Sequence, residues 1–489
     1  MRLKTRTTVD FSYLLFSSVL SQGLRMVRSF IVARLIGPLM FGTIQGLAIF
    51  LLYVPLIQLG YYQAVARELP KRLQAGDQDA VQQISNNGLF MGLLAGLVGL
   101  VLYMTIFAIQ GLSMSGPTRI AWLLFAGMVA LQPVTQFYQM IYNAYGKFVT
   151  VSKIKIANSV VFFLLLVLVL AWDYIGQLIS LLLAAVMIVA LYIAYHPIAF
   201  GLRRIDFAHI AGMIKAGLPI LAAALSFNLF FSIDRLFIIG FKGAEAYGYY
   251  ALGVILFQIA MLVPESIRQI AYRRFNVEFG KSAEETRLRV IFWRTFLLVS
   301  VVMWMLSVTA YHLAPLFIAW FLPAYAPSLP IVKIFSIVMT FTASGLLVSN
   351  ALYASYRQQR VLVIYLISIL IFIGGAAVVM VYDLPTYGIA LTMGASHVLA
   401  WGLMLVVVIR STEYKVPGDW LRKTALLYLV LALVSLAATI GIEGAVGLAP
   451  SLLLSGIAIT LYLLFILAGG LVFRHSLVNL IYEIPSPSG

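Results

Sequence analysis

Two arginines three residues apart, Arg25 and Arg28, lie in a long apolar stretch near the start of the chain. At about 100° per residue they share one helix face with Ser18, Ser21 and Gln22, so that face is polar along its length. An arginine donates two parallel hydrogen bonds to a phosphate, and no carboxylate lies nearby on the same stretch. The pair is therefore our first candidate for a site that binds a phosphate or pyrophosphate group.

Polar side chains also follow single lines along other apolar stretches. Gln132, Gln136, Gln139 and Asn143 have the i, i+4, i+7, i+11 spacing of one helix face, which suits hydrogen bonds to sugar hydroxyls. The other candidates for lining a cavity are Asn228, Ser232 and Gln258. Such groups are also common hydrogen-bonding links between membrane helices, and this interpretation stays open for them. It fits the arginines poorly, because a central arginine costs about 2.5 to 3.5 kcal/mol in a membrane.

Further charged residues fall within the apolar stretches. Arg34, Arg235 and Lys333 lie toward the predicted outer ends, where they are candidates for holding the same anion later in its passage. Asp234 and Glu265 are the carboxylates placed well inside, so they are the candidates for coupling transport to a proton or a sodium ion. The alternative is that each only neutralises a nearby arginine. No other cofactor and no metal is expected.

The composition identifies the surroundings of these residues. Of the 489 residues, 62% are hydrophobic and 10% are charged, whereas a soluble domain is about half apolar and a quarter charged. The chain is therefore predicted to be an integral membrane protein. Its net charge of +16 marks cytoplasmic loops rather than a nucleic-acid partner. With zero cysteines, disulfides and thiolate metal sites are excluded, and the lack of a G-x-x-x-x-G-K motif argues against direct use of ATP.

Apolar runs bounded by glycine, proline and charge predict an all-α protein with fourteen membrane-spanning helices. The predicted spans begin near residues 11, 42, 86, 117, 148, 177, 211, 246, 288, 326, 360, 385, 421 and 449. With the N-terminus in the cytoplasm, only Arg119 and Lys242 of the 33 lysines and arginines fall at outer ends, apart from six inside the spans. Both termini are therefore predicted to be cytoplasmic.

A weak internal repeat organises these spans. The matched segments are 37–42 (GPLMFG) with 243–248 (GAEAYG), 67–68 with 273–274, 145–147 with 355–357, and 172–173 with 382–383. Because each repeat holds six spans, an even number, the halves are parallel and related by an axis along the membrane normal. The predicted parts are an N-terminal lobe at 1–203 with helices 1–6, a C-terminal lobe at 204–412 with helices 7–12, and two added helices with a cytoplasmic tail at 413–489.

The segment Ala33–Gly42 (ARLIGPLMFG) resembles the turn after helix one in the polysaccharide transporter and O-antigen flippase families of the multidrug/oligosaccharidyl-lipid/polysaccharide (MOP) exporter superfamily. Further matches are Ala66–Glu68 with Gly76 and Asp77, Gly217–Pro219, Ile233–Arg235 with Gly248–Tyr250, and Tyr325–Pro327. Ile36 stands where leucine is usual, a chemically silent departure. The resemblance extends over helices one to about twelve and implies two six-helix lobes around a cationic cavity that faces the two sides of the membrane alternately.

The function implied by this resemblance is flipping of a polyprenyl-pyrophosphate-linked oligosaccharide to the outer leaflet of the bacterial cytoplasmic (inner) membrane, for export of a surface polysaccharide. Expected partners are membrane lipids and a polysaccharide polymerase or export machinery, with the flippase itself a monomer rather than an enzyme. Two alternatives remain. A cation-coupled multidrug exporter would share the fold, although arginines would repel cationic cargo. A membrane glycosyltransferase, polymerase or ligase, generally needs a larger outer domain than these short loops provide.

Overall fold

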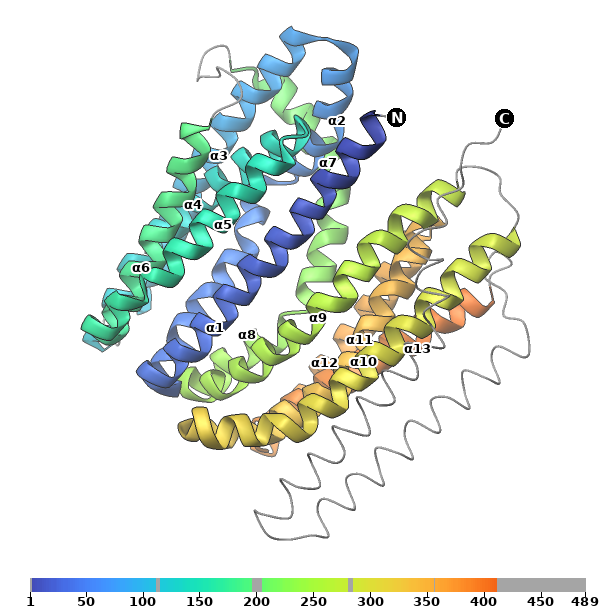
Figure 1. The fold of residues 1–489 in the computed structure, drawn as a ribbon. Coiled ribbons are helices and arrows are strands. Elements are labelled where there is room, and N and C mark those ends of the chain that lie inside the picture. Colours follow the sequence, from blue (N-terminus) through green and yellow to red (C-terminus); the bar gives the residue numbers. More distant parts are fainter. Residues whose placement is uncertain (1, 111–114, 196–204, 280–284, 356, 411–489) are drawn as a thin grey trace. The chain divides into compact units, whose positions relative to one another are not determined.

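The computed structural model describes residues 2–110, 115–195, 205–279, 285–355 and 357–410, and within these ranges the chain forms thirteen α-helices and no strand (Figure 1). The first half comprises α1 Arg2–Tyr53, η1 Val54–Gln58, α2 Tyr61–Ala75, α3 Gln78–Gln110, α4 Gly116–Ala144, α5 Phe148–Leu164 and α6 Leu166–Ala194. The second comprises α7 Phe207–Phe230, α8 Ile233–Phe241, α9 Gly243–Phe279, α10 Glu285–Phe321, η3 Pro323–Ser328, α11 Leu329–Ala354, α12 Gln358–Val381 and α13 Tyr387–Ile409.

Ten segments of the described chain are long and apolar enough to cross a membrane, so the predicted all-α membrane fold is confirmed. The predicted and observed boundaries differ where helices continue through a kink. The first two predicted spans form one helix, α1, broken at Gly37 (φ 73°), where Pro38 also removes a backbone donor. The fifth and sixth meet at a kink inside α6, at Trp172 and Asp173. The thirteenth and fourteenth predicted spans, near residues 421 and 449, lie outside the described residues.

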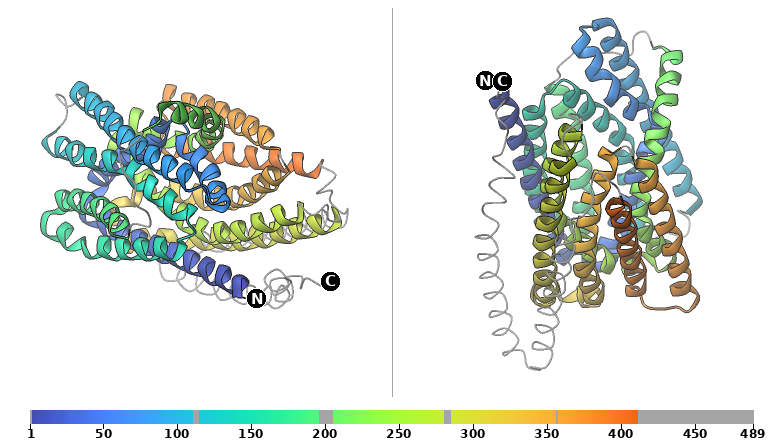
Figure 2. Two further views of the ribbon diagram at one scale, coloured as in Figure 1. Left: turned by 90° about the horizontal axis from the view of Figure 1, so that it is seen from above. Right: turned by 90° about the vertical axis from the view of Figure 1, so that its right-hand side faces the viewer.

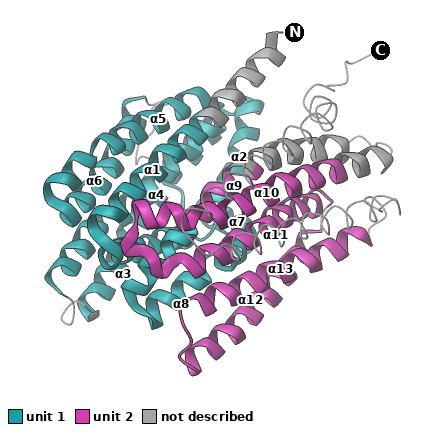
Figure 3. Cartoon of the chain, turned by 60° about the horizontal axis from the view of Figure 1, so that its bottom comes forward, with its two compact units in different colours: residues 1–255 teal, residues 256–489 magenta. Residues whose placement is uncertain are grey.

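The helices group into two compact units, Met1–Ile255 and Leu256–Gly489 (Figure 3). Unit 1 contains α1 to α8 and the start of α9. In unit 2, α11 packs between α10 and α13 and buries most of its side chains. The division into lobes at residues 203 and 412 remains a prediction.

Within unit 1, α1 runs beside α5, as Figure 2 also shows. The helices α3, α4 and α6 pack together behind them through two clusters of buried aromatic side chains. The rings of Tyr138 and Tyr192 stack with their centroids 6.2 Å apart. The ring centroids of Trp122 and Tyr103 lie 4.8 Å apart. These apolar clusters hold the frame on which the polar faces of α1 and α5 meet.

A polar contact attaches the start of α7 to α3. The amide of Asn87 is fully buried and pairs with the peptide of Asp206: its oxygen accepts from Asp206 N at 3.1 Å and its nitrogen donates to Asp206 O at 3.4 Å. The Asp206 carboxylate caps α7 by accepting from His209 N at 2.9 Å, and it also accepts from Gln83 Nε2 at 2.8 Å. The position at which α7 begins is therefore fixed by side chains of α3.

The backbone supports the predicted repeat register at equivalent positions. Gly37 and Gly243, matched by the shift of 206, both have left-handed backbones with φ 73° and 84°. Asp173 and Asp383, matched by the shift of 210, have φ 47° and 44°, a conformation that is uncommon for residues other than glycine. The helix ends at 142–147 and 352–357 also agree, because Lys147 N donates to Tyr142 O at 2.9 Å and Arg357 N to Leu352 O at 2.8 Å.

The two glycine turns of the repeat touch one another inside unit 1. A Cβ atom on Gly42 would lie 1.8 Å from the Ala244 carbonyl oxygen, and one on Gly248 would lie 2.0 Å from the Pro38 carbonyl oxygen. Backbone therefore packs directly on backbone at this point, and only glycine permits it.

We expect Gly248→Ala to lower the free energy of unfolding by about 1 to 3 kcal/mol, because the added methyl group has no space beside Pro38. Gly240→Ala is the matched control, since its Cβ would meet nothing within 4 Å. Thermal unfolding of the purified protein in detergent compares the two. Equal melting temperatures for both variants would contradict the close backbone contact.

Candidate functional site

Arg28 is buried, with 1% of its surface exposed, and it joins three helices. Its Nε donates to the carbonyl oxygen of Phe162 in α5 at 2.8 Å, and its Nη1 donates to Gln177 Oε1 in α6 at 2.6 Å. The guanidinium carbon also lies 3.7 Å from the centroid of the Phe162 ring, within cation–π range. Nη2 has no hydrogen-bond partner among the described residues. Arg28 therefore connects α1 to α5 and α6 and keeps one donor unused.

Arg25 lies one turn earlier on the same face, but its side chain is exposed. Its Nε donates to Ser159 Oγ of α5 at 3.3 Å. When the Asn158 amide is oriented so that its nitrogen donates to Ala184 O at 2.9 Å, its oxygen accepts from Arg25 Nη2 at 3.1 Å. The guanidinium is thus positioned by α5 and remains accessible, which distinguishes it from Arg28.

The sequence analysis missed the face of α5 that meets these arginines. Ser152, Lys155, Asn158, Ser159 and Phe162 follow one another at steps of three, three, one and three residues. The register set by the Arg25–Ser159 and Arg28–Phe162 contacts places Lys155 about one helical turn from Arg25. The signal was present as the same polar helical periodicity that identified α1 and α4.

No ion pair within 4 Å involves Arg25, Arg28 or Lys155 among the described residues. Ion pairs do form at the end of α2, where Glu68 contacts Lys71 and Arg72, and Arg72 contacts Asp77. There, hydrogen bonding to Glu68 raises the pKa of Arg72 above its usual value. The α1–α5 contact consequently holds three cations and no compensating carboxylate in its described surroundings.

A second polar cluster surrounds the start of α8. Asp234 is buried at 3% exposure, accepts a hydrogen bond from the Tyr250 hydroxyl through Oδ2, and has no described partner at Oδ1. Its neighbour Arg235 makes no ion pair with it within 4 Å, and Arg235 Nε is buried without a described hydrogen-bond partner. Ser232 contacts the Tyr53 hydroxyl of α1 at 2.8 Å and donates to Asn228 O at 2.6 Å. Asn228 contributes only its backbone carbonyl to this cluster, and its side chain is exposed.

The remaining predicted residues are more dispersed. On α4, Gln136 accepts from Gln58 Nε2 at 2.9 Å, and Gln132 and Gln139 are half-buried while Asn143 is exposed. On α1, Ser21 is buried, Ser18 is half-buried, and Gln22 and Arg34 are exposed. Gln258 and Lys333 belong to unit 2, where Lys333 Nζ lies 5.0 Å from the centroid of the Tyr311 ring. The side chain of Glu265 lies outside those described.

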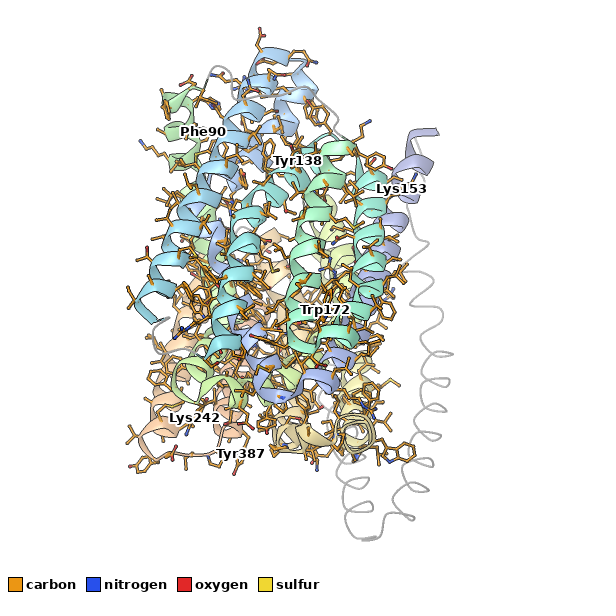
Figure 4. All side chains as sticks on the ribbon, turned by 90° about the vertical axis from the view of Figure 1, so that its left-hand side faces the viewer. Phe90, Tyr138, Lys153, Trp172, Lys242 and Tyr387 are labelled. Carbon is orange, nitrogen blue, oxygen red and sulfur yellow. The ribbon has the colours of Figure 1, made fainter. Side chains whose placement is uncertain are left out.

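The ends of unit 1 separate as the predicted topology requires. Figure 4 shows Lys242, which was predicted at an outer end, toward one end of the helices together with Trp172, and Lys153 toward the other. The prediction of which end faces the cytoplasm remains untested.

Residues 8–273 match the family model described as "Polysaccharide biosynthesis protein". No curated protein sequence matches the chain. Among solved structures, the lipid II flippase MurJ in an inward closed conformation aligns with a TM-score of 0.66 and 14% identity, covering 95% of this chain and 99% of that one. An inward-facing multidrug resistance MATE family transporter of the MOP superfamily aligns with a TM-score of 0.63 and 13% identity, covering 79% of this chain and 93% of that one.

A MOP superfamily transporter from Pyrococcus furiosus, described as having a binding pocket of reverse polarity, aligns with a TM-score of 0.61 and 12% identity over 81% and 94% of the two chains. At these identities the structural likeness concerns the fold alone. The chain shares its fold with these solved transporters.

The different surroundings of the two arginines lead to a stability prediction. Arg28→Ala removes two short hydrogen bonds, leaves Gln177 unpaired and opens a cavity, so we expect a loss of about 2 to 4 kcal/mol. Arg25→Ala removes a longer, part-buried hydrogen bond from a side chain that is itself exposed, and it is expected to cost about 1 kcal/mol. Unfolding in detergent by denaturant measures both, and equal losses would show that Arg28 is not a link between helices.

Proposed function

The chain belongs to the polysaccharide biosynthesis protein family, and from this premise we propose that it flips a polyprenyl-pyrophosphate-linked oligosaccharide from the cytoplasmic to the outer leaflet of a bacterial inner membrane. It is a multi-pass membrane transporter by its apolar helices and its MOP fold. The excess of lysine and arginine at one set of helix ends supports cytoplasmic termini.

The observation that carries this proposal is the accessible guanidinium of Arg25 beside the buried guanidinium of Arg28. Neither has a carboxylate partner in the described chain, and both lie within a helix that is apolar enough to cross a membrane. A pyrophosphate would offset two such charges better than water does, because each phosphate accepts charge-assisted hydrogen bonds. In this mechanism Arg25 binds the headgroup while Arg28 holds α1 against α5 and α6.

The oligosaccharide would follow the row of glutamines on α4. Gln136 accepts a hydrogen bond from Gln58 in this structure. A sugar hydroxyl would take the place of Gln58 as the partner of Gln136 when the oligosaccharide passes. Gln132 and Gln139 are half-buried beside it and offer further donors and acceptors. The isoprenoid chain would stay in the lipid, and a polymerase or export complex would take up the flipped unit.

The alternative functions receive less support. A drug exporter of the same fold would bring cationic cargo toward Arg25 and Lys155, which repel it. A membrane glycosyltransferase would need a carboxylate or other base beside the arginines, and in the described residues the buried carboxylate Asp234 contacts Tyr250 instead.

The flipping function is tested in proteoliposomes with a panel of fluorescent polyprenyl-pyrophosphate glycans that differ in their first sugar. We expect the wild type to expose at least one of them on the opposite leaflet, measured by quenching with an impermeant reagent. Arg25→Ala should slow this about 10- to 100-fold, since a hydrogen bond to a charged group contributes about 1.5 to 3 kcal/mol. Arg25→Lys should recover part of the rate, because lysine keeps the charge without the fork.

Arg119→Ala serves as the control, since this arginine is exposed near the start of α4. Normal flipping by Arg25→Ala, or transport of a cationic dye with no flipping of any glycan lipid, would contradict the proposal.

Coupling to an ion gradient is proposed for the buried carboxylate of Asp234. If Asp234 carries the proton or sodium ion, Asp234→Asn should flip substrate at a rate that no longer responds to either gradient. Tyr250→Phe is the companion variant, because it removes the hydrogen-bond donor and keeps the carboxylate, so the response should persist. An unchanged gradient response in Asp234→Asn would exclude this residue from coupling.

A further inference from the structure

Lys155 is placed beside Arg25 by the register of two helices. The contacts Arg25–Ser159 and Arg28–Phe162 have the same offset of 134 residues, so α1 and α5 run in the same direction side by side. Lys155 precedes Ser159 by four residues, which places it one turn away on the same face, about 6 Å along the axis. With the same offset of 134 residues, Lys155 of α5 lies opposite Ser21 of α1, one helical turn from Arg25.

The ammonium of Lys155 has no hydrogen-bond or ion-pair partner among the described residues, although the side chain is only half-exposed. Around it, the hydroxyls of Ser21 and Ser152 are buried and likewise make no described hydrogen bond. Nη2 of Arg28 is a third unused buried donor on this contact. Unused buried donors beside two neighbouring cations require an anion or water to offset their cost.

We propose that Lys155 is the ligand of the second phosphate, so that Arg25 and Lys155 together select a diphosphate-linked lipid over a monophosphate-linked one. This inference rests on the proposed function and assigns the residue that would hold the second phosphate. Arg25 binds one phosphate through its fork, and Lys155 holds the other as a point charge on a flexible stem. A monophosphate lipid would pair with one of the two cations and leave the other unpaired. The site would therefore bind the diphosphate lipid more tightly than the monophosphate lipid.

Lys153 provides a matched control on the same helix. It is a lysine two residues earlier, its side chain is exposed, and at about 100° per residue it lies on a different face of α5 from Lys155. Lys153→Gln therefore removes the same charge from α5 without touching the contact with Arg25.

The test measures binding of radiolabelled polyprenyl diphosphate and polyprenyl monophosphate, both without sugar, to the full-length protein in nanodiscs. We expect the wild type to prefer the diphosphate. Lys155→Gln should weaken diphosphate binding about tenfold and leave monophosphate binding nearly unchanged, so that the preference is lost. Lys155→Arg should keep the preference, and Lys153→Gln should behave as the wild type.

The inference is overturned if Lys155→Gln keeps the wild-type preference, or if Lys153→Gln loses it equally. Should Lys155→Gln fail to fold, Lys155→Arg and Lys155→Met replace it, and equal preference in these two also overturns it. The flipping assay separates the two proposals. A wild type that flips glycan lipids while Lys155→Gln still discriminates refutes the inference alone, whereas a wild type that neither binds nor flips any of these lipids refutes the proposed function.

Discussion

The guanidinium of Arg28 is the interaction on which the polar side of unit 1 depends. It binds the backbone of α5, the side chain of Gln177 on α6 and the ring of Phe162 at once, so three helices meet at one charged group. A charge buried this far is stable only where hydrogen bonds and an aromatic face replace its water. With Nε and Nη1 of Arg28 engaged on α5 and α6, Arg25 one turn away also contacts α5, and its side chain stays exposed. The positions on α5 and α6 that contact the two arginines carry neutral acceptors, not acids.

Much of this arrangement could be predicted from the sequence. Apolar run length placed the helices, because a membrane-spanning helix must satisfy its own backbone and so leaves a long, unbroken signature. The glycine turns at 37 and 243 were found because a left-handed backbone constrains residue type. Polar periodicity identified α1 and α4, and the same periodicity on α5 was overlooked.

What the sequence could not reveal was which partner each polar group would find. In the sequence, Arg25 and Arg28 are two arginines on one helix face and cannot be distinguished. In the structure, the side chain of Arg25 is exposed, whereas Arg28 has 1% of its surface exposed. The difference arises from contacts 134 and 149 residues away along the chain, which no local pattern encodes. The kinks inside α1 and α6 were likewise predicted as boundaries between spans. A kink within a continuous helix and the end of a helix carry the same proline, glycine or turn residues, so the sequence does not distinguish them.

The contact between the two glycine turns is reciprocal. Gly42 approaches Ala244 while Gly248 approaches Pro38, and each residue of one pair is the repeat counterpart of a residue in the other. This is the pattern of an isologous interface, in which a surface meets its own copy across a two-fold axis. The repeat thus preserves, within one polypeptide, the self-complementary seam of a homodimer of six-helix chains. The two backbone contacts of this seam are therefore equivalent: each repeat supplies one glycine, and that glycine makes room for the backbone of the other repeat.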